Sequence, residues 1–122
     1  MPYYLAQATY TAKAWAAMLK NPQDRVEAVR PAVEKVGGNL ESAYLAFGDY
    51  DGIAIIQIPD NVSAAAISMA LMAGGALKAV KTTPLMKMEE WLEAMENAST
   101  VAYSPPWLQP SLFEKRMTAE KR

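Results

Sequence analysis

Two apolar stretches flank a short Gly- and Asp-rich turn near the middle of the chain. The second, residues 52–58, runs without a polar residue from Ile53 to Ile56. In the first, residues 40–47, the last four residues are nearly as apolar. The intervening residues 48–51 favour a turn, so the pattern predicts an antiparallel hairpin with a four-residue connection. A strand with one wet face alternates apolar and polar residues, and these strands do not. We therefore expect both faces of the sheet to be covered.

Two further strands are predicted at Tyr3–Tyr10 and Leu77–Leu85. Both are rich in Tyr, Thr, Val or Leu, which suit a pleated surface. Pro84 near the end of the last strand cannot donate a ladder hydrogen bond, which places that strand at a sheet edge.

Helix signals fill the intervals between the strands. Asn21, followed by Pro, predicts the start of a first helix, and residues 37–38, both Gly, predict its end. Pro31 lies within the apolar stripe of this helix, which predicts a kink or break near Glu27. Asp60 predicts the N-cap of a second helix of about a dozen residues.

The resulting β-α-β-β-α-β order predicts an α+β fold of the ferredoxin-like type, with a four-stranded antiparallel sheet, over residues 1–98. An amphipathic helix closes this domain, with Met88, Trp91, Leu92 and Met95 on one face. Residues 99–122 are rich in Pro but too apolar for a solvated tail, with Trp107 and Phe113 as possible anchors. We expect this C-terminal extension to dock on the same or a neighbouring subunit.

A ferredoxin-like sheet has helices on one face only, so something else must cover the other face. Each CH₂ group left in water forfeits about 0.8 kcal/mol, which makes an open apolar face costly. A second copy packed sheet on sheet, as an isologous homodimer, is the simplest cover. The alternative is that the C-terminal helix and extension fold back over the same face.

The hairpin resembles a known family. Residues 48–54 read Gly-Asp-Tyr-Asp-Gly-Ile-Ala and are followed by Ile-Pro-Asp at 58–60, which is similar to the Gly-x-Tyr-Asp signature of the GYD domain family. The agreement includes residues 36–38 and 80–83 and extends over residues 1 to about 98. The resemblance implies a ferredoxin-like fold of the dimeric α/β-barrel type and says little about activity. The chain departs from the family at Pro84 and after residue 98.

Composition excludes several classes of chemistry and partner. The chain of 122 residues has no Cys and no His, so thiolate nucleophiles, disulfides, imidazole bases and His metal triads are absent. A net charge of −1 gives no general attraction to nucleic acid or anionic membranes. No signal peptide or membrane span is recognisable. We expect a cytoplasmic protein without a cofactor, whose partners are other copies of itself and a small molecule.

Candidate site residues lie in the turn and on the strands. Tyr50 and Asp51 offer a phenol and a carboxylate for ligand binding or proton transfer, at the mouth of a cavity between helices and sheet or between subunits. Asp51 has an alternative role as a partner of local backbone N–H groups. The other candidate ligand-binding residues are polar groups on apolar strands, with an internal network as their alternative role: Tyr44, Gln57, Thr82 and Thr83.

The remaining charged residues suggest no site. Asp49, Asp51 and Asp60 each have a turn or cap role available and lack the spacing of a Ca²⁺ loop, so we expect no metal site. Arg25, Arg30 and Lys35 alternate with two glutamates along the predicted first helix, which indicates a solvated face of mixed charge. These glutamates are Glu27 and Glu34.

Three functions are compatible with these observations. The first is a homo-oligomeric small-molecule-binding protein, favoured by an apolar sheet with few polar groups and no evident nucleophile and base. The second is a cofactor-free enzyme of the dimeric α/β-barrel type, similar to a monooxygenase or isomerase, in which Asp51 and Tyr50 transfer a proton. The third is a structural or assembly role through the C-terminal arm.

Overall fold

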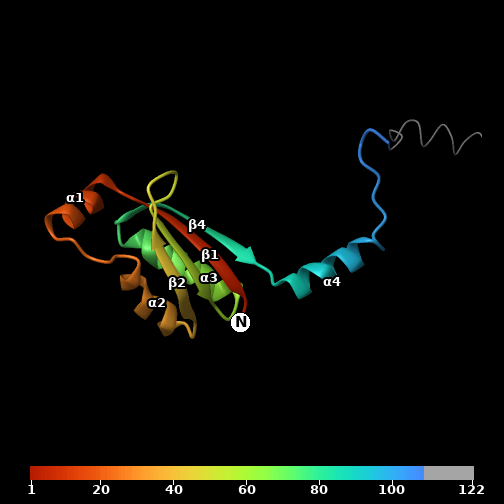
Figure 1. Ribbon diagram of the computed structural model, residues 1–122, viewed down its shortest axis with the longest axis horizontal. Coiled ribbons are helices and arrows are strands. Elements are labelled where there is room, and N and C mark those ends of the chain that lie inside the picture. Colours follow the sequence, from red (N-terminus) through yellow and green to blue (C-terminus); the bar gives the residue numbers. More distant parts are fainter. Residues whose placement is uncertain (109–122) are drawn as a thin grey trace, which may run out of the picture. The chain divides into compact units, whose positions relative to one another are not determined.

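The computed structural model describes residues 1–108 and divides the chain into two compact units, Met1–Met86 and the segment that begins at Lys87. The first unit holds four strands, three α-helices and a short 3₁₀ helix (Figure 1). Their bounds are β1 Tyr3–Tyr10, α1 Ala12–Lys20, η1 Glu27–Val29, α2 Arg30–Lys35, β2 Asn39–Leu45, β3 Gly52–Gln57, α3 Asn61–Ala73 and β4 Leu77–Leu85. The second unit holds α4, Met88–Ala98.

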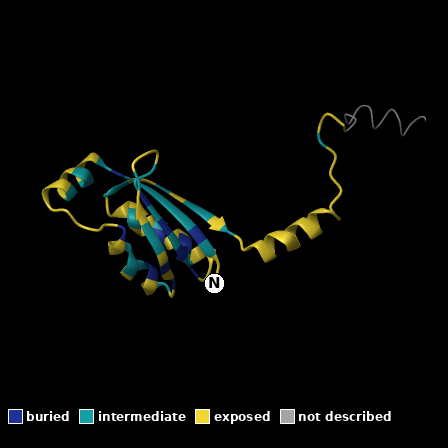
Figure 2. Cartoon of the chain, in the orientation of Figure 1, coloured by how far each residue is buried: buried dark blue, intermediate teal, exposed yellow. Residues whose placement is uncertain are grey.

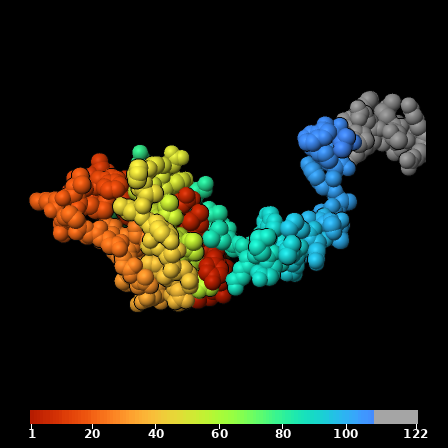
Figure 3. Space-filling view, viewed as in Figure 1, coloured from red at the N-terminus to blue at the C-terminus, as the bar shows by residue number. Residues whose placement is uncertain are grey.

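The four strands form one antiparallel sheet in the order β2-β3-β1-β4. This order and the α+β composition confirm the predicted ferredoxin-like fold. The hairpin β2–β3 and the strand bounds of β1 and β4 follow the prediction closely. Pro84 lies in β4, which is an edge strand as expected. The loop between β2 and β3 projects from one end of the sheet (Figures 1 and 3).

The prediction that a helix begins at Asn21 is wrong. Asn21 instead ends α1, where its backbone N–H donates to the carbonyl of Ala17 at 3.0 Å. The next helical turn begins after Asp24, whose Oδ1 accepts from the N–H of Glu27 at 2.9 Å. Pro31 has no N–H and its ring opposes the carbonyl of Glu27, so α-helix cannot run through this point. The chain forms η1 there and starts α2 afterwards, which confirms the predicted break.

Two glycines end α2 and bring the chain close to β3. Gly37 has a φ of +84°, in the left-handed region that favours glycine. The N–H of Gly38 donates to the carbonyl of Val33 at 2.9 Å. A Cβ on Gly38 would lie 2.4 Å from the carbonyl oxygen of Gln57, so no larger residue fits without moving backbone. These contacts set the distance between α2 and the sheet.

The start of α3 is fixed by two side chains. Oδ1 of Asp60 accepts from the N–H of Ser63 at 2.8 Å, which confirms the predicted N-cap. The hydroxyl of Tyr4, on β1, donates to Oδ1 of Asn61 at 2.7 Å. The first turn of α3 is therefore joined to a central strand.

Within Met1–Met86 only one face of the sheet carries helices, and we call it the inner face. Side chains on it, such as Tyr4 and Ile56, are buried together with Val33 of α2 and Ile67 of α3 (Figure 2). The residues between them on each strand point to the opposite, outer face. There Leu5, Ile55 and Leu85 are only partly buried, and within Met1–Met86 no helix covers them.

The second described unit is amphipathic and exposed. Every residue of α4 is exposed, including the predicted apolar face of Met88, Trp91, Leu92 and Met95 (Figure 2). Trp107, a predicted anchor, is also exposed, and Phe113 lies outside the described residues. No helix among residues 1–108 has the length and apolar character needed to cross a membrane.

Candidate ligand-binding site

Small residues on the inner face leave a cavity between the sheet, α3 and residues 25–29. Ala6 and Ala8 on β1 lie beside Gly52 and Ala54 on β3, where a close-packed core would carry larger side chains. The cavity has a volume of about 200 Å³. An apolar cavity of about 150 Å³ holds one benzene molecule, so this cavity has room for one small ring or branched chain.

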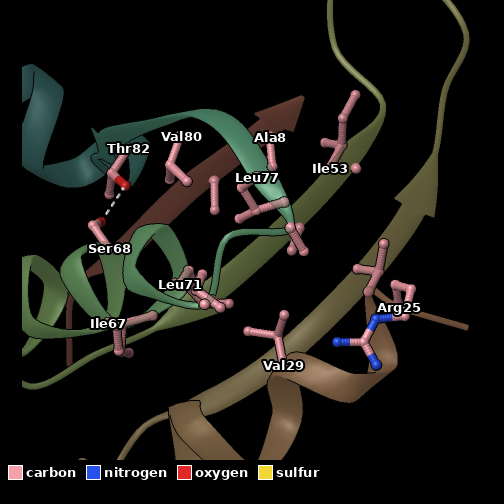
Figure 4. A pocket seen from close by; sticks show the side chains of 18 of the residues that line it. Ala8, Arg25, Val29, Ile53, Ile67, Ser68, Leu71, Leu77, Val80 and Thr82 are labelled. Atoms are coloured by element: carbon pink, nitrogen blue, oxygen red, sulfur yellow. Dashed lines mark hydrogen bonds between the residues drawn. The ribbon is translucent and has the colours of Figure 1, made fainter. Parts of the chain in front are cut away.

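The wall of the cavity is mostly aliphatic. Val29 approaches from η1, Ile67 and Leu71 from α3, and Val80 from the edge strand β4 (Figure 4). Such a wall favours an apolar molecule over water, because water would lose hydrogen bonds there.

One polar pair lies in the wall opposite η1. The Ser68 hydroxyl donates to the carbonyl of Ala64 at 3.2 Å and lies 3.1 Å from Oγ1 of Thr82 (Figure 4). Because a serine hydroxyl has one proton, Thr82 is then the donor to Ser68. The lone pairs of Thr82 stay able to accept a hydrogen bond.

Tyr10 supplies a phenol at the end of β1. Its ring packs edge to face on Trp15, with centroids 5.5 Å apart, and the residue is buried. The hydroxyl fits because residue 52 is glycine: a Cβ there would lie 3.2 Å from the phenol oxygen. Burial raises the pKa of Tyr10, the charges of Asp51 and Asp24 raise it further, and that of Arg25 opposes them. The hydroxyl therefore stays protonated, and able to donate, at any ordinary pH.

Arg25 supplies the cationic group of the cavity wall. The sequence placed it on a solvated helical face with Arg30 and Lys35. Arg25 is exposed, as predicted, but it precedes η1 instead of lying on a helix, and it also lines the cavity. Figure 4 shows its guanidinium on the side where Val29 lies. Arg30 forms an ion pair with Glu27, and both of these side chains are about half exposed.

The turn residues Tyr50 and Asp51 lie beside the cavity's end and do not line it. Oδ2 of Asp51 accepts from the backbone N–H of Tyr10 at 3.0 Å. Its own N–H donates to the carbonyl of Ala8 at 2.8 Å, and its carbonyl accepts from the N–H of Ala46 at 2.6 Å. Asp51 thus joins the hairpin loop to β1 through main-chain groups of Ala8 and Tyr10, and it closes the loop through the N–H of Ala46.

The sequence matches the model of the GYD domain over residues 4–95. The chain belongs to the GYD domain family. The match confirms the resemblance seen in the hairpin and its flanking motifs. A comparison with curated proteins finds no match.

Two solved structures are similar to this GYD domain. The crystal structure of FFRP-DM1 has a TM-score of 0.50 and 14% identity, over 70% of this chain and 100% of that chain. The crystal structure of TTHA0845 from Thermus thermophilus has a TM-score of 0.48 and 14% identity, over 71% of this chain and 95% of that chain. At this identity the likeness concerns the fold alone.

In the structure of this GYD domain, the six candidate residues lie in different places. Thr82 lines the cavity, whereas Tyr44, Gln57 and Thr83 belong to the outer face by their register on the sheet. Tyr44 is exposed, and Nε2 of Gln57 donates to the carbonyl of Met1 at 3.3 Å. With Tyr50 and Asp51 in the loop, the six residues form no single site.

Two residues of this GYD domain's cavity, Tyr10 and Arg25, were missed by sequence reasoning. The available signal was the run of small residues at alternate positions 6, 8, 52 and 54, which predicts space on one face of paired strands. Among residues 1–108 no three acidic side chains come together in a way that would hold a metal ion. Asp60 caps α3, and Asp51 bonds to Tyr10.

Proposed function

We propose that this GYD domain protein is a homodimer that binds one small molecule in the inner-face cavity of each subunit. The cavity itself carries the proposal: it is about 200 Å³, mostly apolar, and has Tyr10, Arg25 and Thr82 in its wall. Small-molecule sites commonly combine an apolar wall with a few polar groups that orient the ligand.

The outer face supports the dimer. Leu5, Ile55 and Leu85 form an apolar surface that is only partly buried in one subunit, and Tyr44 is 65% exposed beside them. Phe47, in the hairpin loop, is fully exposed. A second sheet packed on this face would remove these side chains from water. The cavity lies on the inner face, so dimerisation would leave it open to a ligand.

Methyl NMR of the full chain tests the binding proposal, with benzyl alcohol as the probe. We expect saturable shifts in the methyl signals of Ile67, Leu71 and Val80, which line the cavity. Ala70→Leu narrows the cavity and should abolish these shifts, whereas Ala66→Leu on the same helix does not line it and should preserve them. Shifts that are absent in the wild type, or that persist unchanged in Ala70→Leu, would refute the proposal.

A reaction at Asp51 and Tyr50 has less support. The Asp51 carboxylate accepts a hydrogen bond from a main-chain N–H, and neither residue lines the cavity. A ligand in the cavity would therefore contact Tyr10 and Arg25, which line it, and not Asp51 or Tyr50.

A second proposed role, assembly through the C-terminal segment, rests on α4. Its apolar residues Trp91 and Leu92 are each about half exposed, and its other face carries only acidic charges, Glu89, Glu90, Glu93 and Glu96. In the first unit α1 buries none of its residues and carries Lys13, Lys20 and an exposed Leu19. This complementarity of charge and apolar surface supports docking of α4, with the extension that follows it, on α1 of a neighbouring subunit.

Light scattering of full-length variants tests the assembly role. We expect the wild type to exceed the mass of a dimer and Trp91→Ser to return to that mass. Glu93→Ser, on the polar face of α4, is the matched control. We expect more than half of this variant to remain in assemblies heavier than a dimer. Equal masses for wild type and Trp91→Ser would show that α4 does not join subunits.

A further inference from the structure

Arg25 is the one charged side chain in a mostly apolar wall, and it is exposed to solvent. Its Nη1 donates to the side-chain oxygen of Gln23 at 3.2 Å. Within the described part of the chain no carboxylate forms an ion pair with Arg25, whereas the nearby Arg30 pairs with Glu27. A guanidinium has five N–H donors, so Arg25 has further donors for a ligand.

Tyr10 adds a neutral donor to the same end of the cavity. Both residues line it, and the charge of Arg25 acts on the phenol of Tyr10. Because burial keeps that phenol protonated, its O–H is able to donate to an anion. A guanidinium and a hydroxyl donor together are the groups that proteins commonly use to hold a carboxylate.

The rest of the wall selects against other ligands. None of the residues that line the cavity is acidic. The two carboxylates whose charges reach Tyr10, those of Asp24 and Asp51, lie outside the wall and accept hydrogen bonds from main-chain N–H groups. Arg25 is the one cationic side chain among them, and it balances a single negative charge. This favours a monoanion over a phosphate dianion. Ile67, Leu71 and Val80 offer only apolar contact to the remainder of the molecule.

We infer that the cavity takes a small monocarboxylate with an apolar body the size of about one benzene ring. The carboxylate lies toward Arg25 and Tyr10. The body packs against Ile67, Leu71 and Val80, which are labelled in Figure 4. The inference rests on the proposed function, because it names the ligand class of the same cavity.

Calorimetric titration of the full chain with phenylacetate and with its neutral isostere phenylacetamide tests the ligand class. We expect phenylacetate to bind at least 10-fold more tightly. Arg25→Met keeps an apolar stem but no charge, so we expect it to lower the affinity for phenylacetate to that for phenylacetamide. Arg25→Lys keeps the charge, so we expect it to lose less than half of the preference for phenylacetate over phenylacetamide. Tyr10→Phe should weaken phenylacetate several-fold and leave the amide unchanged.

The outcomes separate this inference from the proposed function. Equal affinity for the two probes, both lost in Ala70→Leu, would overturn the carboxylate inference and leave small-molecule binding intact. No binding of either probe at millimolar concentration would overturn both. Phenylacetate binding that survives unchanged in Ala70→Leu would place the anion outside the cavity and also overturn the inference.

Discussion

Oδ2 of Asp51 accepts a hydrogen bond from the backbone N–H of Tyr10 at a distance of 3.0 Å. The register between β1 and β4 shifts between Thr9 and Tyr10, so β1 leaves regular pairing with that neighbour at this point. The signature carboxylate thus holds the main chain of the residue whose phenol lines the cavity. In this GYD domain Asp51 of the signature motif therefore stabilises the backbone beside the cavity without lining the cavity itself.

Asp51→Asn and Asp51→Ala should therefore differ in stability. The amide oxygen of Asn can still accept from Tyr10, so we expect a loss below about 1 kcal/mol. Ala leaves a part-buried N–H without its partner, which costs about 1–3 kcal/mol. Urea unfolding followed by circular dichroism measures both. Equal losses would show that the negative charge, and not the acceptor, is what matters.

Gly38→Ala should be among the most damaging substitutions in the chain. Its Cβ would lie 2.4 Å from the carbonyl oxygen of Gln57, and relief of that overlap requires backbone movement. We expect a loss of about 1–3 kcal/mol or more, as for other overpacked sites. Gly48→Ala is the control, because nothing lies within 4 Å of a Cβ there. A Gly38→Ala protein with the urea midpoint of Gly48→Ala would contradict the packing of α2 on β3.

Asp60 gives the stability of α3 a defined pH dependence. The backbone N–H of Ser63 donates to this carboxylate and holds its pKa below the usual 3.8. Because the pKa of Asp60 is lower in the folded than in the unfolded protein, the hydrogen bond contributes its full stabilisation above pH 3.8. This stabilisation is lost as the pH falls from 3.8 toward the pKa of the folded state. Asp60→Asn still caps the helix but does not titrate. The difference in urea midpoint between wild type and Asp60→Asn should shrink below pH 3.8, and a constant difference would refute this role.

The dimer proposal predicts that charge on the outer face separates the subunits. Ile55 lies on β3 between Leu5 and Ser42 of the neighbouring strands, near the middle of that face. Ile55→Lys would bury an unpaired ammonium in the dimer, which costs several kcal/mol. We expect the dissociation constant in sedimentation equilibrium to rise at least 100-fold. Val62→Lys, at an exposed position of α3, should dimerise normally. Unchanged association of Ile55→Lys would exclude this face as the interface.

Much of the fold was predictable because its signals are local. The Asp60 cap, the glycines after α2 and the break at Pro31 each depend on residues within one or two helical turns. Asn21 misled because Asn followed by Pro suits the start of a helix, while here Asn21 ends α1.

The site was harder to predict, because its residues meet only in the folded sheet. Tyr10 and Arg25 are 15 positions apart, at the end of β1 and in the segment before η1. Nothing in their local sequence marks them as neighbours of α3. Asp51 and Tyr50 were conspicuous in the sequence because turns concentrate Asp, Tyr and Gly. The structure gives Asp51 a main-chain partner and leaves Tyr50 outside the cavity.

The number of ligands bound per dimer tests the account most directly. Equilibrium dialysis with labelled phenylacetate, at protein concentrations where sedimentation gives the dimer, measures it for the full chain. A cavity inside each subunit predicts two molecules per dimer, both lost in Ala70→Leu and retained in Ala66→Leu. One molecule per dimer would place the site between the subunits, and none would leave the inner-face cavity without a ligand; either result would contradict the account.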